Sequence, residues 1–185
     1  MITLGPTLET SRLILRPPVL ADFGPWAEMM ADEENSGFIG GPMVRSAAWR
    51  GFAGSAGSWA LLGFSMFSVI EKSSGQWLGR IGPHKPEGWP GTEVGWGLHK
   101  NAWGKGYALE AATATIDWVF DHLGWTDVIH TIAPANTPSQ KLAIALGSVN
   151  RGQGRLPAPY EASPVDIWGQ SREDWWLGGV SRTSE

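Results

Sequence analysis

The feature that most constrains this chain is a strand-like run that passes through a glycine-rich turn into the clearest helix of the sequence. Residues 91–98 have the pattern of a strand, and the turn Trp103-Gly104-Lys105-Gly106-Tyr107-Ala108 follows. Apolar residues then recur at helical spacing from about Gly106 to Leu123, and Gly124 supplies a stop signal. A strand that leads directly into an amphipathic helix is typical of helices packed on a sheet.

The rest of the chain alternates in the same way. We expect further strands at residues 8–16, 64–71, 76–81, 128–133 and 165–168. We expect helices at residues 22–32, from residue 46 and at residues 138–146, with a glycine-rich loop or short broken helix at residues 33–43. No repeat or linker divides the sequence. The prediction is an α/β (α+β mixed sheet) fold in which one domain, residues 1–185, has a central mixed sheet flanked by helices.

Composition excludes several classes of protein. With 185 residues, 42% hydrophobic and 17% charged, the chain is long and apolar enough for a real core. A net charge of -4 argues against a surface that coats nucleic acid. The absence of cysteine excludes disulfides, thiolate metal sites and a cysteine nucleophile. The start of the sequence lacks a secretory pattern, and the longest apolar stretch is too short for a bilayer, so we expect a soluble cytoplasmic protein with no membrane partner.

Period-two alternation places two sets of residues on opposite faces of the strand at 91–98. One set is apolar, and the other is almost bare backbone. The apolar set is Val94, Trp96 and Leu98, and the bare set is Glu93, Gly95, Gly97 and His99. Glycines inside a strand mark either the close approach of a ligand or room for a bulky neighbour such as Trp, and the pattern alone leaves both open.

The turn from Trp103 to Ala108 predicts an anion site. Successive backbone N–H groups at a helix N-terminus favour a phosphate or carboxylate, and Lys105 either adds a charge or is a solvated turn residue. A Walker loop does not fit, because His99 stands where its first glycine is needed. A dinucleotide fingerprint fails because Lys100 replaces its third glycine.

The run EVGWGLHKNAWGKGYALEA, followed by a strand and then by APANTPSQKLAIALG, resembles the GNAT superfamily of N-acetyltransferases. The likeness is to its Rim-type branch in particular, which acetylates protein N-termini and assorted small amines. LETSRLILRP also resembles the first strand of that branch, so the resemblance covers most of the chain. It implies a GNAT-like fold and an acetyl-CoA-dependent N-acetyltransferase, monomeric or homodimeric, acting on a protein N-terminal or small-molecule amine. The alternative is a non-catalytic acyl-CoA-binding module.

The resemblance also implies roles for individual residues. The family loop that cradles the acetyl-CoA pyrophosphate is similar to the turn here, and the strand ending at Leu98 would offer backbone groups to the pantetheine arm and acetyl carbonyl. Asn136 is similar to the family's cofactor-binding Asn, and Ser139 stands where the branch often has a hydroxyl that protonates the departing thiolate. The implied cofactor-binding turn residues are Trp103, Gly104, Lys105, Gly106, Tyr107 and Ala108.

Three positions depart from the family pattern. Asn101 stands where the loop often begins with Gln or Arg, and Ala143 stands where many members have a Tyr acid. Gly147-Ser148 replaces the family's Gly-Phe, which removes an aromatic packing residue. The general acid is therefore Ser139, or no side chain supplies it.

Glu93 is the candidate base, acting directly or through water, because it lies on the bare face of the strand. The alternative is a carboxylate in solvent or in an ion pair. His99 is on the order of 20 Å further along the strand and cannot serve the same atom. His130 either faces the site or is a hydrogen-bonded structural residue. No spacing typical of a metal site or a serine hydrolase occurs.

Two other groups of residues have alternative interpretations. The acidic run Asp32, Glu33 and Glu34 either attracts a cationic amine or is a solvated helix end. Trp175 and Trp176 either pack on the core or form a subunit contact, and we expect core packing.

Overall fold

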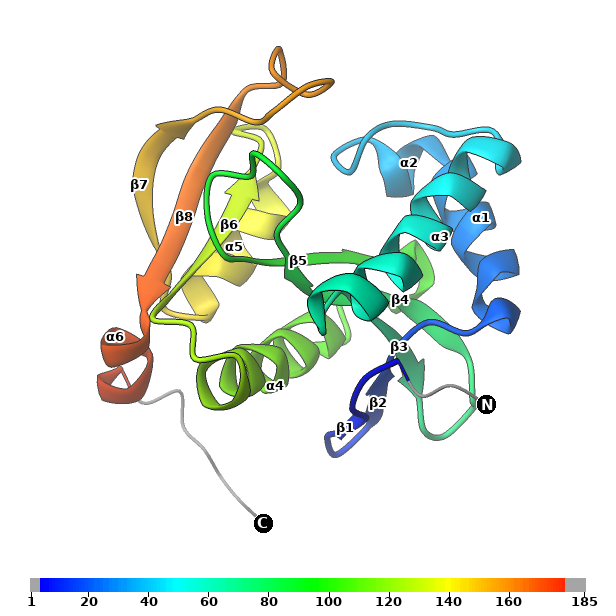
Figure 1. Cartoon of the computed structure of the whole chain (residues 1–185), viewed down its shortest axis with the longest axis horizontal. Coiled ribbons are helices and arrows are strands. Elements are labelled where there is room, and N and C mark those ends of the chain that lie inside the picture. The colour runs from blue at the N-terminus through cyan, green and yellow to red at the C-terminus, as the bar shows by residue number, and fades with distance from the viewer. Residues whose placement is uncertain (1–3, 179–185) are drawn as a thin grey trace. The chain divides into compact units, whose positions relative to one another are not determined.

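The computed structural model describes residues 4–178, which form helices and a mixed β-sheet (Figure 1). The strands are β1 (Leu8–Glu9), β2 (Leu13–Arg16), β3 (Phe67–Glu71), β4 (Trp77–His84), β5 (Glu93–Leu98), β6 (Asp127–Ile132), β7 (Val149–Gly154) and β8 (Val165–Ser171). The helices are α1 (Phe23–Ala31), α2 (Glu33–Ser36), α3 (Arg45–Leu62), α4 (Tyr107–His122), α5 (Thr137–Ala145) and α6 (Arg172–Leu177), with 3-10 turns η1 (Leu20–Asp22) and η2 (Lys100–Ala102). The strand order is β1-β2-β3-β4-β5-β6-β8-β7. The predicted mixed α/β class is confirmed.

The chain forms two compact units, and β5 and α4 each pass from one to the other. The first unit comprises residues 1–84 and 95–115, and the second comprises residues 85–94 and 116–185. That the chain is a single domain stays a prediction.

In the first unit, β1 to β4 pair antiparallel in sequence order. Leu13 and Leu15 are fully buried, so alternate residues of β2 form one apolar face. The expected single strand over residues 8–16 is instead a hairpin, because the Thr10 N–H donates to the Leu13 carbonyl at 3.0 Å and the chain turns between them. The sequence shows no glycine or proline at that turn.

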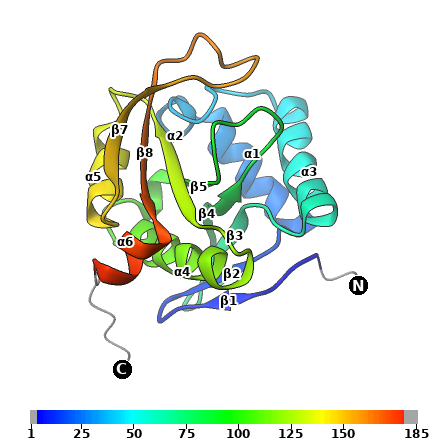
Figure 2. The ribbon, with the colours of Figure 1, turned by 60° about the vertical axis from the view of Figure 1, so that its left-hand side comes forward.

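Helices α1 and α3 lie side by side in the first unit (Figures 1 and 2). Their contact is aromatic: the ring centroids of Trp26 and Phe52 are 5.4 Å apart at an angle of 79°, and Phe23 packs on Phe52 at 5.5 Å. Helix α3 forms in spite of three internal glycines because Phe52 and Trp59 bury one face of it. Tertiary packing here outweighs a cost of about 1 kcal/mol per glycine.

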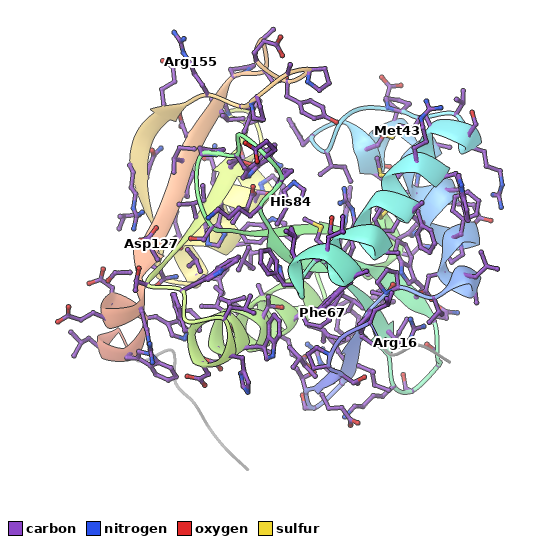
Figure 3. The ribbon with its side chains drawn as sticks, in the orientation of Figure 1. Arg16, Met43, Phe67, His84, Asp127 and Arg155 are labelled. Atoms are coloured by element: carbon purple, nitrogen blue, oxygen red, sulfur yellow. The ribbon has the colours of Figure 1, made fainter. Side chains whose placement is uncertain are left out.

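The second unit contains the antiparallel strands β6, β8 and β7 (Figure 2). Asp127, the first residue of β6, is labelled in Figure 3, and its carboxylate accepts two hydrogen bonds from Arg151 of β7 at 2.8 and 2.6 Å. Trp175 is 3% exposed and its Nε1 donates to Asp117 at 2.8 Å, which confirms core packing for this residue, whereas Trp176 is 39% exposed.

An ion pair between the half-buried Arg16 and the buried Asp22 joins β2 to the start of α1. Arg16, labelled in Figure 3, donates from Nη1 and Nη2 to the two oxygens of Asp22 at 2.7 and 2.9 Å, and the Ser68 hydroxyl donates to the same carboxylate at 2.7 Å. Burial opposes the charge on Asp22, but the hydrogen bonds from Arg16, the Val19 N–H and Ser68 together outweigh it and hold the pKa of this carboxyl below its usual value. Asp22 precedes α1 as expected, but its side chain makes no cap hydrogen bond to that helix.

Replacing Asp22 by Asn should lower the free energy of unfolding at pH 7 by about 2 to 3 kcal/mol, because the Arg16 charge then loses its partner. Urea denaturation measures the change. Asp32→Asn is the matched control, since it breaks a more exposed ion pair with Lys100 and keeps an N-cap, so it should cost less than about 1 kcal/mol. Equal costs for the two variants would contradict the role given to Asp22.

Candidate functional site

The turn between η2 and α4 has the backbone that an anion site needs. Gly104 and Gly106 have φ values of +71° and +79°, which other residues rarely adopt. A Cβ on Gly106 would also lie 3.4 Å from Nη2 of Arg12. The turn ends at the first residues of the 16-residue helix α4, whose N-terminal N–H groups and dipole favour an anion.

The Arg12 side chain, which lies outside this turn in the sequence, holds the turn in place by hydrogen bonds. Its Nη1 donates to the Lys105 carbonyl at 2.9 Å and its Nε donates to Glu110 Oε2 at 2.7 Å. The other Glu110 oxygen accepts from the Arg12 backbone N–H at 2.9 Å and from the Thr10 hydroxyl. Burial opposes the charge of Glu110, but these hydrogen bonds hold its pKa below the usual value. The sequence analysis missed both residues, because a single Arg and a single Glu almost a hundred positions apart give no local signal.

Tyr107 anchors the end of the turn. It is 8% exposed, its hydroxyl donates to Glu71 Oε1, and the Arg12 guanidinium lies 4.5 Å from the centre of its ring. The hydrogen bond to Glu71 raises the pKa of Tyr107. Hydrogen bonds from Ser74 and then Tyr107 lower the pKa of Glu71. Tyr107 is therefore fixed by its side chain, while its backbone lies in the turn.

At the end of β5, one of the two expected backbone groups of Leu98 is already engaged. Its carbonyl accepts from Trp103 Nε1 at 2.8 Å. The N–H of the next residue, His99, donates to the Leu78 carbonyl of β4 at 2.8 Å. Because backbone groups alternate along a strand, the Leu98 N–H points to the opposite edge of β5 from the His99 N–H. The N–H, rather than the carbonyl, is the Leu98 group suited to a ligand.

The ammonium group of Lys100 binds the acidic segment, Asp32 to Glu34, that was expected to attract a cationic amine. Its Nζ lies 2.6 Å from Asp32 and 3.3 Å from Glu34, and its backbone N–H donates to Asn35 Oδ1 at 2.9 Å. The hydrogen bonds to Asp32 and then Glu34 raise the pKa of Lys100. One positive charge is therefore held by two of the three carboxylates, Asp32 and Glu34, which weakens the attraction for a cationic amine.

In the second unit, Glu93 is buried and hydrogen-bonded. It is 6% exposed, and its Oε1 accepts from the Thr131 N–H at 3.1 Å and from the Thr131 hydroxyl at 3.0 Å. Its Oε2 accepts from Trp89 Nε1. The alternative of a carboxylate in solvent does not hold, because the side chain lies in a polar interior site.

Asn136 and Ser139 lie together at the start of α5. Asn136 is the N-cap, and its Oδ1 accepts from the Ser139 N–H at 3.3 Å. Ser139 is half-buried on the first turn of the helix. Ala143 is fully buried, so the position at which many GNAT members have a Tyr acid is part of the core here.

His130 belongs to a buried polar network that the sequence analysis did not find. It is 1% exposed, with Nδ1 2.7 Å from the Val94 carbonyl and Nε2 3.0 Å from the Ser148 hydroxyl. Gln170 donates from Nε2 to the same hydroxyl at 3.0 Å and to the Leu146 carbonyl at 2.8 Å. The sequence did contain a signal for this network: Ser148 stands where the family has an aromatic residue, and the smaller side chain leaves room for polar groups.

These bonds fix the state of the imidazole. A carbonyl can only accept, so Nδ1 carries the proton and Nε2 accepts from Ser148. Burial lowers the pKa of His130 to about 4. His130 is therefore a neutral, hydrogen-bonded structural residue near pH 7, as one of the two interpretations of the sequence expected.

Within residues 4–178, no three His, Cys, Asp or Glu side chains gather in a way that could hold a metal ion. None of the helices in that range combines the length and the apolar character needed to cross a bilayer.

Comparison with known proteins identifies what the chain is similar to. Residues 12–149 match the acetyltransferase (GNAT) domain family. An uncharacterized N-acetyltransferase, p20, of Bacillus licheniformis is 31% identical over 165 residues, which cover 88% of this chain and 93% of the relative.

Solved structures share the fold. The crystal structure of an acetyltransferase from Agrobacterium tumefaciens str. C58 has a TM-score of 0.79 and 29% identity, covering 90% of this chain and 95% of that one. RimJ of Mycobacterium smegmatis, solved in complex with CoA-disulfide, has a TM-score of 0.69 and 18% identity, covering 88% of this chain and 83% of that one. Rim-type proteins are therefore among the structural neighbours in fold.

Two histidines, the half-buried His84 and the buried His130, predict how stability depends on pH. Burial and then the charge of Arg80 lower the pKa of His84, labelled in Figure 3, to about 4, the same value as for His130. Both folded-state values lie below 6.5, so the unfolded chain binds more protons and stability should fall as the pH drops from about 6.5 toward 4. Replacing either residue by Asn should reduce the slope between pH 6.5 and 5 by up to about 1.4 kcal/mol per pH unit.

The free energy of unfolding, measured by urea denaturation at several pH values, gives this slope. Carboxylates titrate mainly below that window, so a slope that does not change in either variant would contradict the lowered pKa values of the two histidines.

Proposed function

The chain belongs to the GNAT acetyltransferase family, and we propose that it moves an acetyl group from acetyl-CoA to a primary amine by direct attack of the amine on the thioester. The acceptor in this proposal is a protein N-terminal α-amine or a small-molecule amine. The observation that carries the proposal is the turn of Gly104 and Gly106 at the start of α4, braced by Arg12 and Tyr107.

The groups present in the turn suit the phosphates of acetyl-CoA. Backbone N–H groups at a helix N-terminus bind phosphate without any particular side chain, and a braced turn holds them ready. We propose that Leu98 binds the cofactor through its N–H and that Asn136 contacts it from the start of α5. The proposed turn ligands are Trp103, Gly104, Lys105, Gly106, Tyr107 and Ala108.

The acceptor must be neutral when it attacks. An α-amine with a pKa of about 7.7 to 8.0 is partly neutral near pH 7.5, whereas a lysine amine near 10.4 is almost wholly charged. A site with few proton-transfer groups therefore favours an α-amine. Of the two proposed acceptors, this preference favours a protein N-terminal α-amine, the kind of acceptor that the Rim-type branch acetylates.

We propose one chemical group of the protein for each step of the acetyl transfer. The amine nitrogen bonds to the acetyl carbon, and the Leu98 N–H stabilises the oxyanion that forms. Glu93, directly or through water, takes the proton that the nitrogen loses. The carbon–sulfur bond then breaks, and Ser139 gives its proton to the thiolate. The hydrogen bonds that Glu93 accepts favour transfer through a water molecule over direct contact.

Saturating acetyl-CoA should raise the melting temperature. At about 100 times the dissociation constant, binding contributes roughly 2.7 kcal/mol, or a shift on the order of 5 to 10 °C for a chain of this size. Replacing Gly104 and Gly106 together by Val should abolish the shift, because Val cannot adopt their backbone conformation. Gly124→Val is the matched control: Gly124 also has a positive φ, +65°, but lies beyond the other end of α4, so this variant should lose stability and keep the shift.

No shift at millimolar acetyl-CoA in the unsubstituted protein would refute the cofactor assignment.

Turnover with a panel of amines tests the chemistry, and thiol release reports it without background because the chain has no cysteine. Ser139→Ala should lower kcat by about 10- to 1000-fold and keep the acetyl-CoA shift. Ser58→Ala, which removes a hydroxyl on α3, is the control and should leave kcat unchanged.

Glu93→Gln should also lower kcat, and the loss should shrink at high pH, where the acceptor is already neutral.

An unchanged kcat would remove the substituted residue from the mechanism. Acetyl-CoA binding without thiol release for any amine would support the alternative of a non-catalytic acyl-CoA-binding module.

A further inference from the structure

A surface hollow lies between β7, β8 and α6 in the second unit, where β8 runs directly into α6 (Figure 2). Its volume is about 470 Å³, which is enough for a small organic molecule. We name it the edge hollow, because β7 is the last strand in the order of the sheet. The lining residues that bear on its chemistry are Gly147, Val149, Arg151, Gln170, Asp174 and Leu177. The proposed acetyl transfer uses none of these six residues.

One wall of the edge hollow belongs to Gln170, whose side chain is held rigidly by the protein. Gln170 is 4% exposed, and its Nε2 donates to the Leu146 carbonyl at 2.8 Å and to the Ser148 hydroxyl at 3.0 Å. A carbonyl can only accept, so the amide nitrogen must be the atom that faces Leu146. The position of the amide oxygen, Oε1, is therefore fixed before any ligand binds.

This oxygen is an acceptor without a donor. Within residues 4–178, no N–H or O–H group bonds to Oε1 of Gln170. A Cβ on Gly147 would lie 3.3 Å from Oε1, and because Gly147 is exposed and has no Cβ, the oxygen is left open on that side. Polar atoms of buried side chains nearly always have a partner, so an open acceptor of this kind indicates a place for a donor from outside the chain.

The charges around the edge hollow favour a cation. Both terminal nitrogens of Arg151 donate to the carboxylate of Asp127, at 2.8 and 2.6 Å, so these two charges cancel. Asp174 forms no ion pair in the part of the chain that the structure describes, and its Oδ2 accepts from the Ser171 hydroxyl at 2.7 Å. The edge hollow is therefore left with one negative charge, that of Asp174.

Two apolar side chains form the rest of the relevant wall. Val149 is 62% exposed and Leu177 is 77% exposed, and both line the edge hollow. Helix α6, which carries Leu177, is anchored by Trp175, whose Nε1 donates to Asp117 at 2.8 Å. Apolar surface beside a few fixed polar groups is typical of sites for small molecules.

We propose that the edge hollow binds a primary ammonium ion that carries a short alkyl chain. The ammonium donates to Oε1 of Gln170 and is attracted by the Asp174 carboxylate, while the alkyl chain packs on Val149 and Leu177. A primary ammonium suits these groups because it combines a positive charge with three N–H donors and no acceptor. The site shares no residue with the proposed transfer site, and it does not rest on the proposed function.

A titration of the isotope-labelled full chain with n-butylammonium chloride at pH 7, without acetyl-CoA, tests the proposal by NMR. The backbone amide signals of Gly147, Gly169 and Leu177 should shift and saturate in the millimolar range, as expected for a small ligand held by few contacts. n-Butanol has the same alkyl chain without the charge, and it should bind about tenfold more weakly or less tightly still. Sodium chloride at equal ionic strength should leave these signals in place.

A pair of glycine variants tests the location. Gly147→Ala places a methyl group against Oε1 of Gln170 and should weaken binding of butylammonium about fivefold or more. Gly152→Ala is the matched control, because Gly152 also has a positive φ, +101° against +86° for Gly147, but a Cβ there meets nothing within 4 Å. The control should have a similar backbone strain and should bind butylammonium as the unsubstituted protein does.

Asp174→Asn tests the charge. The amide keeps an oxygen that can accept from Ser171 and removes the negative charge, so binding of butylammonium should weaken about two- to fivefold, the effect of one exposed ion pair. The difference between this variant and the unsubstituted protein should shrink as salt is added. The affinity for n-butanol should not change.

The absence of saturable shifts at the edge hollow, equal binding of butanol and butylammonium, or equal binding in Gly147→Ala and Gly152→Ala would overturn the proposal. Shifts confined to other parts of the chain would also overturn it, since the amine would then bind elsewhere, and they would leave the proposed acetyl transfer intact. If Gly147→Ala does not fold, Asp174→Asn decides alone, and an unchanged affinity for butylammonium in that variant overturns the proposal.

Discussion

The guanidinium of Arg12 is the contact on which the glycine turn depends. It reaches the Lys105 carbonyl, the Glu110 carboxylate and the face of the Tyr107 ring at once. Glycines give a turn its shape but no rigidity, because they have more conformations to lose than any other residue. Rigidity has to come from neighbours, and here a single side chain from the hairpin of β1 and β2 supplies much of it. The anion site is thus made by a flexible backbone that is held from outside.

Buried polar side chains also hold backbone segments in place in the second unit. Glu93 accepts a hydrogen bond from the Thr131 N–H, and His130 donates to the Val94 carbonyl. The Ser148 hydroxyl bonds to His130 and accepts from Gln170. Such a network is stable only when each member has its partners, because an unpaired polar group in the interior is costly. Buried side chains thus bond backbone groups of both β5 and β6, and each of these side chains has further partners of its own.

The sequence predicted the elements whose pattern is local. The strand ending at Leu98, the turn at Gly104 and Gly106 and the helix α4 all lie within two residues of their expected bounds. Strand β7 was missed because it is mostly polar, glycine-containing and exposed, so no alternation marks it. Helix α6 was missed although Ser171 and Asp174 form a capping box that could have indicated it.

The sequence could not predict long-range pairs at the candidate site. Arg12 and Glu110, or His130 and Ser148, meet only because the fold brings distant segments together, and one sequence carries no record of that. Glu93 and Ser139 were selected by pattern and resemblance, and their catalytic roles stay predictions. What the structure adds for Glu93 is its surroundings: a carboxylate with hydrogen-bond donors on both oxygens, rather than one in solvent.

Lys100 has a consequence for the protein's own chemistry. It lies two residues beyond Leu98, and its ammonium is bonded to Asp32 and Glu34, which raise its pKa. A protonated nitrogen has no lone pair to attack a thioester. The two carboxylates therefore hold the Lys100 amine in its protonated form, in which it cannot act as an acetyl acceptor.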